Sequence, residues 1–346
     1  MLNKIKNTVE EALKKHVSDM DGIYPFKRLS PLLGESIKEY IARPGKRVRP
    51  MLFVLGYLAF AKKPASGLYQ SALSIELLHD FMLIHDDIID KSDSRRGRPS
   101  MHKMLNNRLR LDKSVKFNGQ DLAIVVGDII YAMAIKSFLS IKENPVRKEK
   151  ALNKLLDAVL YTGAGQFIEI IYGIKRIDKI NKNDIYRIYD LKTAYYTFAY
   201  PLSIGATLAG APEKQIKKIF DYGLILGRAF QIKDDILGIF GNEEETGKSS
   251  LTDLQEAKRT LLIWYAYNNS PKKDRSQISA VFSKKKVDRT DLSRMRQIIH
   301  GSGALAYAKG QISTAAKKAD KIISSLGTGA NIKKLLSEFY RNILSL

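Results

Sequence analysis

The chain has 346 residues, of which 45% are hydrophobic, and its formal net charge is +22. It contains no cysteine, which excludes disulfide bonds and thiolate metal sites and favours a reducing, cytoplasmic environment. Its amphipathic first segment is not typical of a signal peptide, and no stretch of about 18 uncharged apolar residues suits a membrane span. The basic residues are spread along the chain without a familiar nucleic-acid module. We therefore expect a solvated lysine-rich surface and no specific nucleic-acid partner, with peripheral contact to anionic membrane as a further hypothesis.

Helical periodicity dominates the chain. Apolar residues recur at helical spacing in residues 37–41, 71–90, 151–172, 185–208 and 216–240. Glycine and proline punctuate the sequence between these blocks, and strand-like alternation is scarce. The pattern predicts an all-α fold, a single large helical bundle around a central cavity, with residues 1–346 in one domain. We expect the charged segment 269–289 to be a loop on this domain.

The first candidate site lies where an apolar helical segment ends in Asp86, Asp87 and Asp90. On a helix, Asp86 and Asp90 lie about 6 Å apart along the axis and share a face. The next positions on that face, Met82 and Ser94, supply no cation to relieve the repulsion between the two carboxylates. A divalent cation would relieve it, and ligands that are all oxygen favour Mg²⁺. The alternative is a charged helix end whose aspartates cap the next turn.

A second acidic pair, Asp234 and Asp235, also follows an apolar helical run, and Gln231 precedes Asp234 by about one turn. Two acidic helix faces can meet across a bundle cavity and hold several Mg²⁺ ions between them. Lys248 follows in an expected loop, where the alternative is an ordinary solvent-exposed lysine.

Cationic groups accompany both acidic sets. Segment 44–50 places three basic residues between two prolines, where the backbone is restrained. Arg95 and Arg96 follow the first acidic set, and Lys192 and Thr193 lie inside another helical segment. The planar fork of arginine binds two phosphate oxygens at once. Together with the aspartates, these groups predict a cavity for two diphosphates, one bridged through Mg²⁺ and one held directly by cations. For each group alone, the alternative is a solvated face.

In this combination the chain resembles the trans-isoprenyl diphosphate synthases, with a motif pattern most similar to that of geranylgeranyl and farnesyl diphosphate synthases. The resemblance rests on the segments GKRVRP, DDIID…RRG, KT, FQIKDD, TGK and EAKRTLL, in this order. It covers nearly the whole chain, and several independent motifs in this order are far more specific than one aspartate-rich motif. It implies a homodimeric prenyltransferase of isoprenoid biosynthesis that joins isopentenyl diphosphate to an allylic diphosphate by 1'-4 trans condensation.

The resemblance also implies roles for single residues. The expected catalytic residues are Asp86, Asp87, Asp90, Asp234, Asp235 and Lys192. Three Mg²⁺ ions are implied, with the direct ligands Asp86, Asp90 and Asp234. Isopentenyl diphosphate is expected to contact Lys46, Arg47, Arg49, His79 and Arg96. The allylic diphosphate is expected to contact Arg95, Lys192, Thr193, Gln231, Lys248 and Lys258.

One position departs from the pattern of the family. Many members carry a third aspartate in the second acidic motif, where this chain has Gly238. Because the direct ligand in that motif is its first aspartate, we expect activity to survive. The implied chemistry is electrostatic: Mg²⁺ and the cations stabilise the departing pyrophosphate, and the isopentenyl double bond attacks the allylic cation.

Product length depends on what closes the hydrocarbon tunnel below the metal site. Phe81 and Met82 lie five and four residues before Asp86, roughly one turn deeper on the helix. By resemblance, an aromatic residue at position 81 with none at position 82 predicts geranylgeranyl diphosphate, C20, with farnesyl diphosphate, C15, as the alternative. Helical arithmetic leaves open that Phe81 is an ordinary core residue.

Three competing interpretations remain at this stage. A class I terpene cyclase would share the helical bundle and an aspartate-rich motif, but it would not need GKRVRP or the Arg95–Arg96 pair. An inactive partner subunit should have lost parts of the acidic or cationic sets, and only Gly238 departs. A basic protein that binds nucleic acid would show tight, sequence-dependent retention of duplex at physiological salt.

Overall fold

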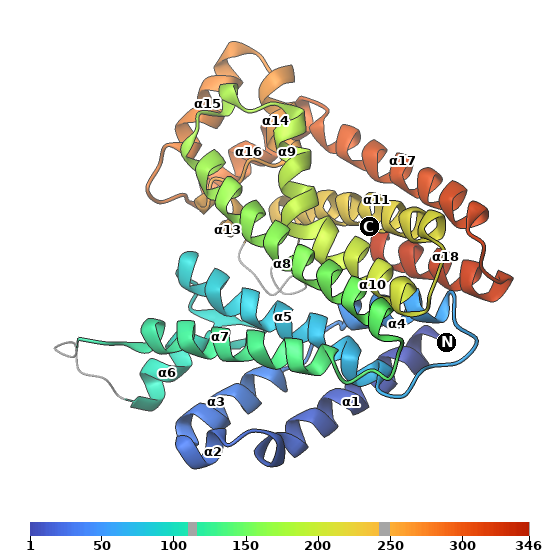
Figure 1. The fold of residues 1–346 in the computed structure, drawn as a ribbon. Coiled ribbons are helices and arrows are strands. Elements are labelled where there is room, and N and C mark those ends of the chain that lie inside the picture. Colours follow the sequence, from blue (N-terminus) through green and yellow to red (C-terminus); the bar gives the residue numbers. More distant parts are fainter. Residues whose placement is uncertain (110–115, 242–249, 346) are drawn as a thin grey trace. The chain divides into compact units, whose positions relative to one another are not determined.

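The computed structural model shown in Figure 1 describes residues 1–109, 116–241 and 250–345, and most of these residues lie in helices. The Cα positions fall into two compact units, and we describe each by itself. The first unit comprises Met1–Leu155 and Ile204–Ala211, and the second comprises Leu156–Ser203 and Pro212–Leu346. The all-α prediction is confirmed, whereas the single domain over residues 1–346 stays a prediction.

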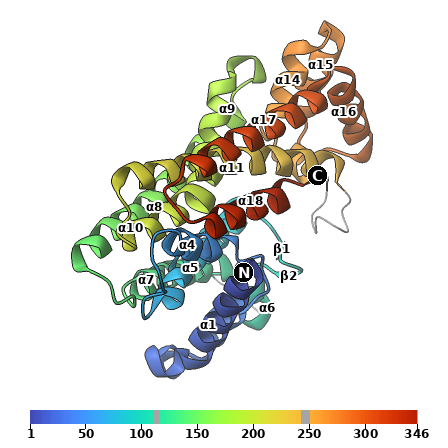
Figure 2. The same cartoon turned by 90° about the vertical axis from the view of Figure 1, so that its right-hand side faces the viewer.

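The first unit is built on helices from the N-terminal part of the chain. Its elements are α1 (Leu2–Ile23), α2 (Phe26–Leu29), α3 (Pro31–Ile41), α4 (Val48–Leu58), α5 (Leu68–Ile89), β1 (Ser94–Arg95), β2 (Arg98–Pro99), α6 (Met101–Leu109), α7 (Gly119–Phe138) and the first part of α8 (Pro145–Ile174). The two short strands pair as an antiparallel hairpin, which Figure 2 labels.

Helix α5 is the core element of the first unit because twelve of its residues, apolar and polar, are buried. Leu73, Leu77 and Ile84 are fully buried, as expected of a helix surrounded by protein. Helix α7 packs along α5, and the two run side by side in Figure 1. Gly127 allows this close approach, since a Cβ atom there would overlap the His85 ring. The predicted helix at residues 71–90 is thereby confirmed.

The second unit is organised around a long helix, α11. Its elements are the remainder of α8, η1 (Ile177–Lys179), α9 (Lys182–Ile188), η2 (Tyr189–Ala199), α10 (Tyr200–Leu208, of which the last part lies in the first unit), α11 (Glu213–Phe240), α13 (Thr252–Gln255), α14 (Leu261–Asn269), α15 (Lys272–Phe282), α16 (Arg289–Gly301), α17 (Ala304–Ser325) and α18 (Ala330–Leu344). Helix α11 packs against η2 on one side and α17 on another. The element η2 is a π-helix, in which Tyr200 N–H bonds to the Tyr195 carbonyl, five residues back.

The charged segment 269–289 contains a helix, so the prediction of a loop there was wrong. Helix α15 occupies most of this segment and buries Ile278 and Val281. These two residues are spaced by three, which is one helical turn, and their burial stabilises a helix whose other positions are mostly charged or polar.

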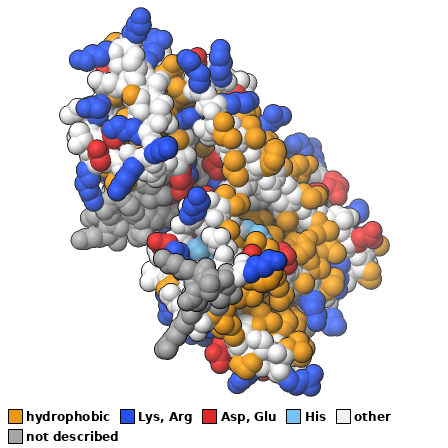
Figure 3. Space-filling model, turned by 90° about the vertical axis from the view of Figure 1, so that its left-hand side faces the viewer, with side chains coloured by type: hydrophobic (Ala, Val, Ile, Leu, Met, Phe, Trp, Pro, Cys, Tyr) orange, Lys and Arg blue, Asp and Glu red, His pale blue; other side chains and the backbone are white. Residues whose placement is uncertain are grey.

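The surface and the helix lengths bear on two further predictions. On the face drawn in Figure 3, lysine and arginine side chains are spread over the described surface and form no continuous stripe. Among the described residues, every helix is too short or too polar to pass through a lipid bilayer.

Candidate active site

The first acidic motif occupies the C-terminal end of α5. Asp86 and Asp87 lie in its last turn, and Asp90 follows directly as the capping residue, with its N–H bonded to the Asp86 carbonyl at 2.8 Å. Asp86 and Asp90 are partly exposed, whereas Asp87 is buried. Carboxylates at the C-terminus of a helix oppose its dipole, so this cluster needs cations nearby to be stable.

Arg95 supplies one of these cations to the buried aspartate. Its Nε donates to Asp87 Oδ1 at 2.8 Å, its Nη2 bonds the same oxygen, and Asp86 Oδ2 lies 3.7 Å from Nη2. The hairpin that carries Arg95 turns at Arg96 and Gly97, which both have positive φ, as tight two-residue hairpin turns require. The structure therefore brings Arg95 to the first acidic motif and leaves Asp86 and Asp90 on the accessible side.

The cations predicted to bind isopentenyl diphosphate gather in the same unit. Burial, together with the charges of four arginines, holds the pKa of the His79 imidazole well below its ordinary value, so this ring is neutral at pH 7. These arginines are Arg47, Arg49, Arg95 and Arg96. Lys46, which directly precedes Arg47 in the sequence, is exposed. A neutral imidazole can donate a hydrogen bond to phosphate without adding a further positive charge that the neighbouring arginines would repel.

Arg47 differs from the other members of this cluster because its guanidinium is almost fully buried. Its Nε donates to Glu10 at 3.0 Å, Nη1 to Glu76 at 2.7 Å and Nη2 to the Arg43 carbonyl at 2.6 Å. Its side chain is only 1% exposed. These contacts tie α1, the end of α3 and α5 together, which sequence reasoning did not anticipate.

The two residues predicted to control chain length lie on α5 one turn before the motif. Phe81 is half-buried, with its ring 5.3 Å from that of Tyr131 on α7 and 4.7 Å from that of His85. Met82 is also half-buried. Phe81 is thus packed between α5 and α7 while part of its surface remains accessible.

The second acidic motif lies on α11 in the second unit. Asp234 is exposed, whereas Asp235 is buried and accepts hydrogen bonds from the Tyr189 hydroxyl and from Gln231 Nε2 at 2.9 Å. Gln231 Oε1 in turn accepts from Thr193 Oγ1 at 2.7 Å. Burial raises the pKa of the Asp235 carboxyl well above its ordinary value. This chain of bonds fixes α11 to the π-helix η2.

Lys192 lies on the same π-helix, beside Thr193, and forms an ion pair with Glu169 of α8. Sequence reasoning missed Glu169 and Tyr189, because neither lies in a motif. Their positions in the sequence do not indicate that they contact Lys192 and Asp235, because these contacts form only when the helices pack.

The position of the absent third aspartate is explained by a neighbour. A Cβ atom on Gly238 would overlap Oδ2 of Asp253, so the carboxylate of Asp253 occupies the space that a side chain at position 238 would need. Asp253 lies on α13 and pairs with Lys258 at 2.8 Å, and Glu256 pairs with the same lysine at 2.9 Å. These two carboxylates raise the pKa of the Lys258 ammonium well above its ordinary value, against the effect of burial. Lys248 lies outside the described residues.

The donor chemistry of both motifs fits Mg²⁺. Among the described residues, no three side chains of histidine, aspartate or glutamate gather as a ready-made metal site. Mg²⁺ binds oxygen, keeps several waters and commonly uses one or two protein carboxylates plus substrate phosphates. Asp86 and Asp90 supply such an incomplete oxygen set in one unit, and Asp234 supplies another in the other unit. That the two sets meet is still a prediction.

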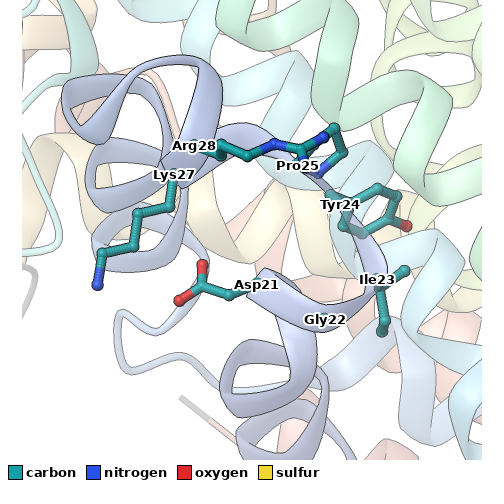
Figure 4. A pocket seen from close by; sticks show the side chains of 7 residues that line it. All are labelled: Asp21, Gly22, Ile23, Tyr24, Pro25, Lys27 and Arg28. Carbon is teal, nitrogen blue, oxygen red and sulfur yellow. The ribbon is translucent and has the colours of Figure 1, made fainter.

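The structure also contains cavities away from these motifs. One of about 700 Å³ lies at the turn between α1 and α2, and Figure 4 shows its lining residues. It is lined by Asp21, Gly22, Ile23, Tyr24, Pro25, Lys27 and Arg28. A second, of about 340 Å³, lies beside Asp190 and Arg228 in the second unit. None of the predicted site residues lines either cavity, so we do not assign the predicted chemistry to them.

Comparisons with known proteins agree with this arrangement. The chain is 32% identical over 322 residues to geranylfarnesyl diphosphate synthase of Aeropyrum pernix, covering 91% of this chain and 95% of that protein. It is 29% identical over 310 residues to geranylgeranyl diphosphate synthase of Methanosarcina mazei, covering 89% of this chain and 87% of that protein. In fold it is similar to a crystal structure of geranylgeranyl pyrophosphate synthase from Corynebacterium glutamicum in complex with isoprenyl diphosphate and magnesium. That similarity has a TM-score of 0.88 at 24% identity and covers 100% of this chain and 99% of the other.

The sequence model of one family, described as polyprenyl synthetase, matches residues 30–299. This match covers most of the chain and includes both acidic motifs and the basic segment before α4. The chain therefore belongs to the polyprenyl synthetase family and is a trans-prenyltransferase.

Proposed function

We propose that the chain condenses isopentenyl diphosphate with an allylic diphosphate, in a Mg²⁺-dependent 1'-4 trans reaction, to form a short-chain prenyl diphosphate. The observation that carries this proposal is that accessible carboxylates and a cluster of cations occur together in the unit that contains α5. Two accessible carboxylates, Asp86 and Asp90, lie in the same unit as a cluster of arginines and the neutral His79. Family membership and the names of the similar proteins support the same reaction.

The residues divide the work between two diphosphates. Arg49, Arg96 and His79, with Lys46, bind the diphosphate of isopentenyl diphosphate through direct contacts. Lys192 and Thr193 bind the allylic diphosphate from the π-helix. These positions leave Asp86 and Asp90 for Mg²⁺, because Arg95 already compensates the charge of buried Asp87.

Mg²⁺, when bound by Asp86, Asp90 and Asp234, neutralises the charge that develops on the departing pyrophosphate. We propose three ions per site, which requires the two acidic motifs to face each other across one cavity. The chain's own cations hold the pyrophosphate while the allylic C–O bond breaks, and this electrostatic stabilisation is usually the largest single term in such catalysis. The isopentenyl double bond then attacks the allylic cation, which forms the new C–C bond and leaves a tertiary cation. A neighbouring carbon loses a proton to the released pyrophosphate, and its C–H electron pair becomes the new double bond.

The product we propose is geranylgeranyl diphosphate. Phe81 is packed against Tyr131 but remains half-accessible, which supports a role as the end of a tunnel that admits four isoprene units. One comparison favours a longer alternative, C25, since the similar protein from Aeropyrum pernix is a geranylfarnesyl diphosphate synthase. Farnesyl diphosphate remains the shorter alternative.

The active form we propose is a homodimer. In the second unit, α8 exposes a row of large apolar side chains, including Leu160 at 68%, Phe167 at 68% and Ile174 at 79%. They are seven residues apart, so they form one stripe along the helix. Exposed apolar surface of this kind marks protein–protein interfaces, and we propose that a second copy of this chain covers it.

The test is to incubate the purified protein with labelled isopentenyl diphosphate, geranyl or farnesyl diphosphate and Mg²⁺, and to size the products after removal of phosphate. We expect C20 as the main product, no reaction after chelation with EDTA, and a dimer by light scattering. A main product of C30 or longer would contradict the assignment of Phe81. Release of a hydrocarbon without isopentenyl diphosphate would instead indicate a terpene cyclase.

A further inference from the structure

Two buried carboxylates lie on α5 ahead of the acidic motif, and the proposed reaction uses neither. Glu76 and Asp80 are one helical turn apart and are 2% and 0% exposed. Neither oxygen of Asp80 accepts a hydrogen bond from any described residue, and the same holds for Glu76 Oε2. A buried carboxylate without donors is costly when ionised and is readily protonated.

Arg96 forms an ion pair with Asp80. Its Nη1 lies 3.4 Å from Asp80 Oδ1, without forming a hydrogen bond, and its Nη2 lies 3.7 Å from Glu76 Oε1. Its side chain is 17% exposed, so the guanidinium contacts the buried acids while part of it remains accessible to solvent. Arg96 is therefore shared between the buried acids and any anion that binds above it.

The other charged and titratable groups around Asp80 lie on its own helix and on the segments packed against it. Arg47 and Arg49, before and within α4, act on it together with Glu76 of its own helix. From α3, the buried Tyr40 hydroxyl also faces it. Of the remaining elements packed on α5, α1 contributes Glu10, which reaches the cluster through Arg47. Helix α7 contributes Tyr131 and Asp128, which contact Phe81 and His85. Helix α6 contributes His102, Lys103 and Arg108, which contact Ser100, Asp93 and Ser36.

We propose that Asp80 is a positioning residue, acting through Arg96, that couples the binding of isopentenyl diphosphate to proton uptake. This inference rests on the proposed function. An arriving diphosphate attracts Arg96 away from Asp80 and adds negative charge nearby. Both changes disfavour the Asp80 carboxylate, which takes a proton from the solvent. No bond of the substrate changes in this step.

The consequence is a pH-dependent affinity for isopentenyl diphosphate. In the absence of substrate, burial and Glu76 raise the pKa of Asp80 to about 7, against the arginines. A bound diphosphate raises it further, and by linkage the affinity is highest at low pH and falls as pH rises through 7. A further rise of about one pKa unit would increase the KM for isopentenyl diphosphate about fourfold between roughly pH 7 and 8.5, and about tenfold in the limit.

The test compares the wild-type protein with Asp80→Asn, which mimics the protonated side chain in shape and charge. We expect the KM of the variant for isopentenyl diphosphate to stay near the low-pH wild-type value throughout, so that the ratio of wild-type to variant KM grows with pH. Titration of the substrate itself is common to both proteins and cancels in this ratio. The KM for the allylic substrate should show no such divergence. Asp128→Asn removes an exposed carboxylate from α7, and it should keep the wild-type profile.

The possible results distinguish failure of the role of Asp80 from failure of the proposed function. An equal rise in both proteins, or a wild-type KM that is flat above pH 7, overturns the role of Asp80 while leaving the proposed function intact. A protein that forms no product from isopentenyl diphosphate at any pH refutes the proposed function instead. A purely structural role would lower the melting temperature or kcat without changing the dependence of KM on pH.

If Asp80→Asn does not fold, Asp80→Thr removes the same charge. Proton uptake on binding can also be measured for the wild-type protein by calorimetry in two buffers, at a pH above the substrate's own titration.

Discussion

Arg47 belongs to the basic segment that was predicted to bind isopentenyl diphosphate, but its contacts predict a structural role that can be measured. We expect Arg47→Met to destabilise the protein strongly. The methionine fills most of the space of the arginine stem but removes the guanidinium that donates to Glu10, Glu76 and the Arg43 carbonyl. Glu76 is 2% exposed and would keep one weaker cation, Arg96, at 3.7 Å.

The magnitude follows from this burial. Breaking a buried ion pair by removing one partner costs about 3–5 kcal/mol, because the other charge is left buried without compensation. The Glu10 contact adds little, since its carboxylate is 30% exposed and can be solvated. We therefore expect a loss of about 3–5 kcal/mol in the free energy of unfolding. Adding Glu76→Gln to the variant should recover part of this loss, because it removes the orphaned charge.

The assay is urea unfolding followed by circular dichroism, with Arg98→Met as the matched control. Arg98 also forms an ion pair, with Glu39 at 3.0 Å, but its side chain is 54% exposed, so its loss should cost less than about 1 kcal/mol. Equal stability of Arg47→Met and the wild-type protein, together with a large rise in the KM for isopentenyl diphosphate, would show that Arg47 binds substrate and would refute the structural role.

Two further changes test the site. Phe81→Ser removes the ring that packs on Tyr131, and we expect the product to lengthen beyond C20 on chromatography; an unchanged distribution would place the tunnel end elsewhere. Gly238→Asp restores the aspartate common in the family, yet its side chain would displace Asp253, so we expect a loss of about 1–3 kcal/mol and lower activity. Combining it with Asp253→Gly should recover most of the stability, and a single variant as stable as wild type would show that Asp253 moves freely.

Periodicity and motif spacing predicted the elements that carry the site. The apolar run before Asp86 predicted a helix, and α5 ends at Ile89 within one residue of the expected boundary. The same holds for the helix that carries Asp234, which runs from Glu213 to Phe240. These predictions succeed because long apolar helices are determined locally by spacing.

Partners distant in sequence could not be predicted, because packing alone selects them. The pairing of Lys192 with Glu169, and the occupation of the space at Gly238 by Asp253, each join separate helices. The π-helix η2 was also missed. Its bonds span five residues where an α-helix spans four, and the same apolar pattern serves both.

The angular positions of the acidic residues around α5 determine which of their carboxylates are buried and which are accessible. At about 100° per residue, Glu76, Asp80 and Asp87 fall within about 40° of one another, and Asp90 and Asp86 form a second row about 40° and about 80° from Glu76, the nearest member of the first. The first row is buried and compensated by arginines, whereas the second is accessible. A single helix thus carries one row of carboxylates that arginines compensate and a second, accessible row to which the proposed Mg²⁺ ions would bind. Because the two rows share one helix backbone, we expect a change of charge at Asp80 to act on Arg96, which is proposed to bind isopentenyl diphosphate, while Asp86 and Asp90 keep their geometry. We therefore expect proton uptake by Asp80 beside the proposed diphosphate site to leave the proposed metal ligands, Asp86 and Asp90, in place.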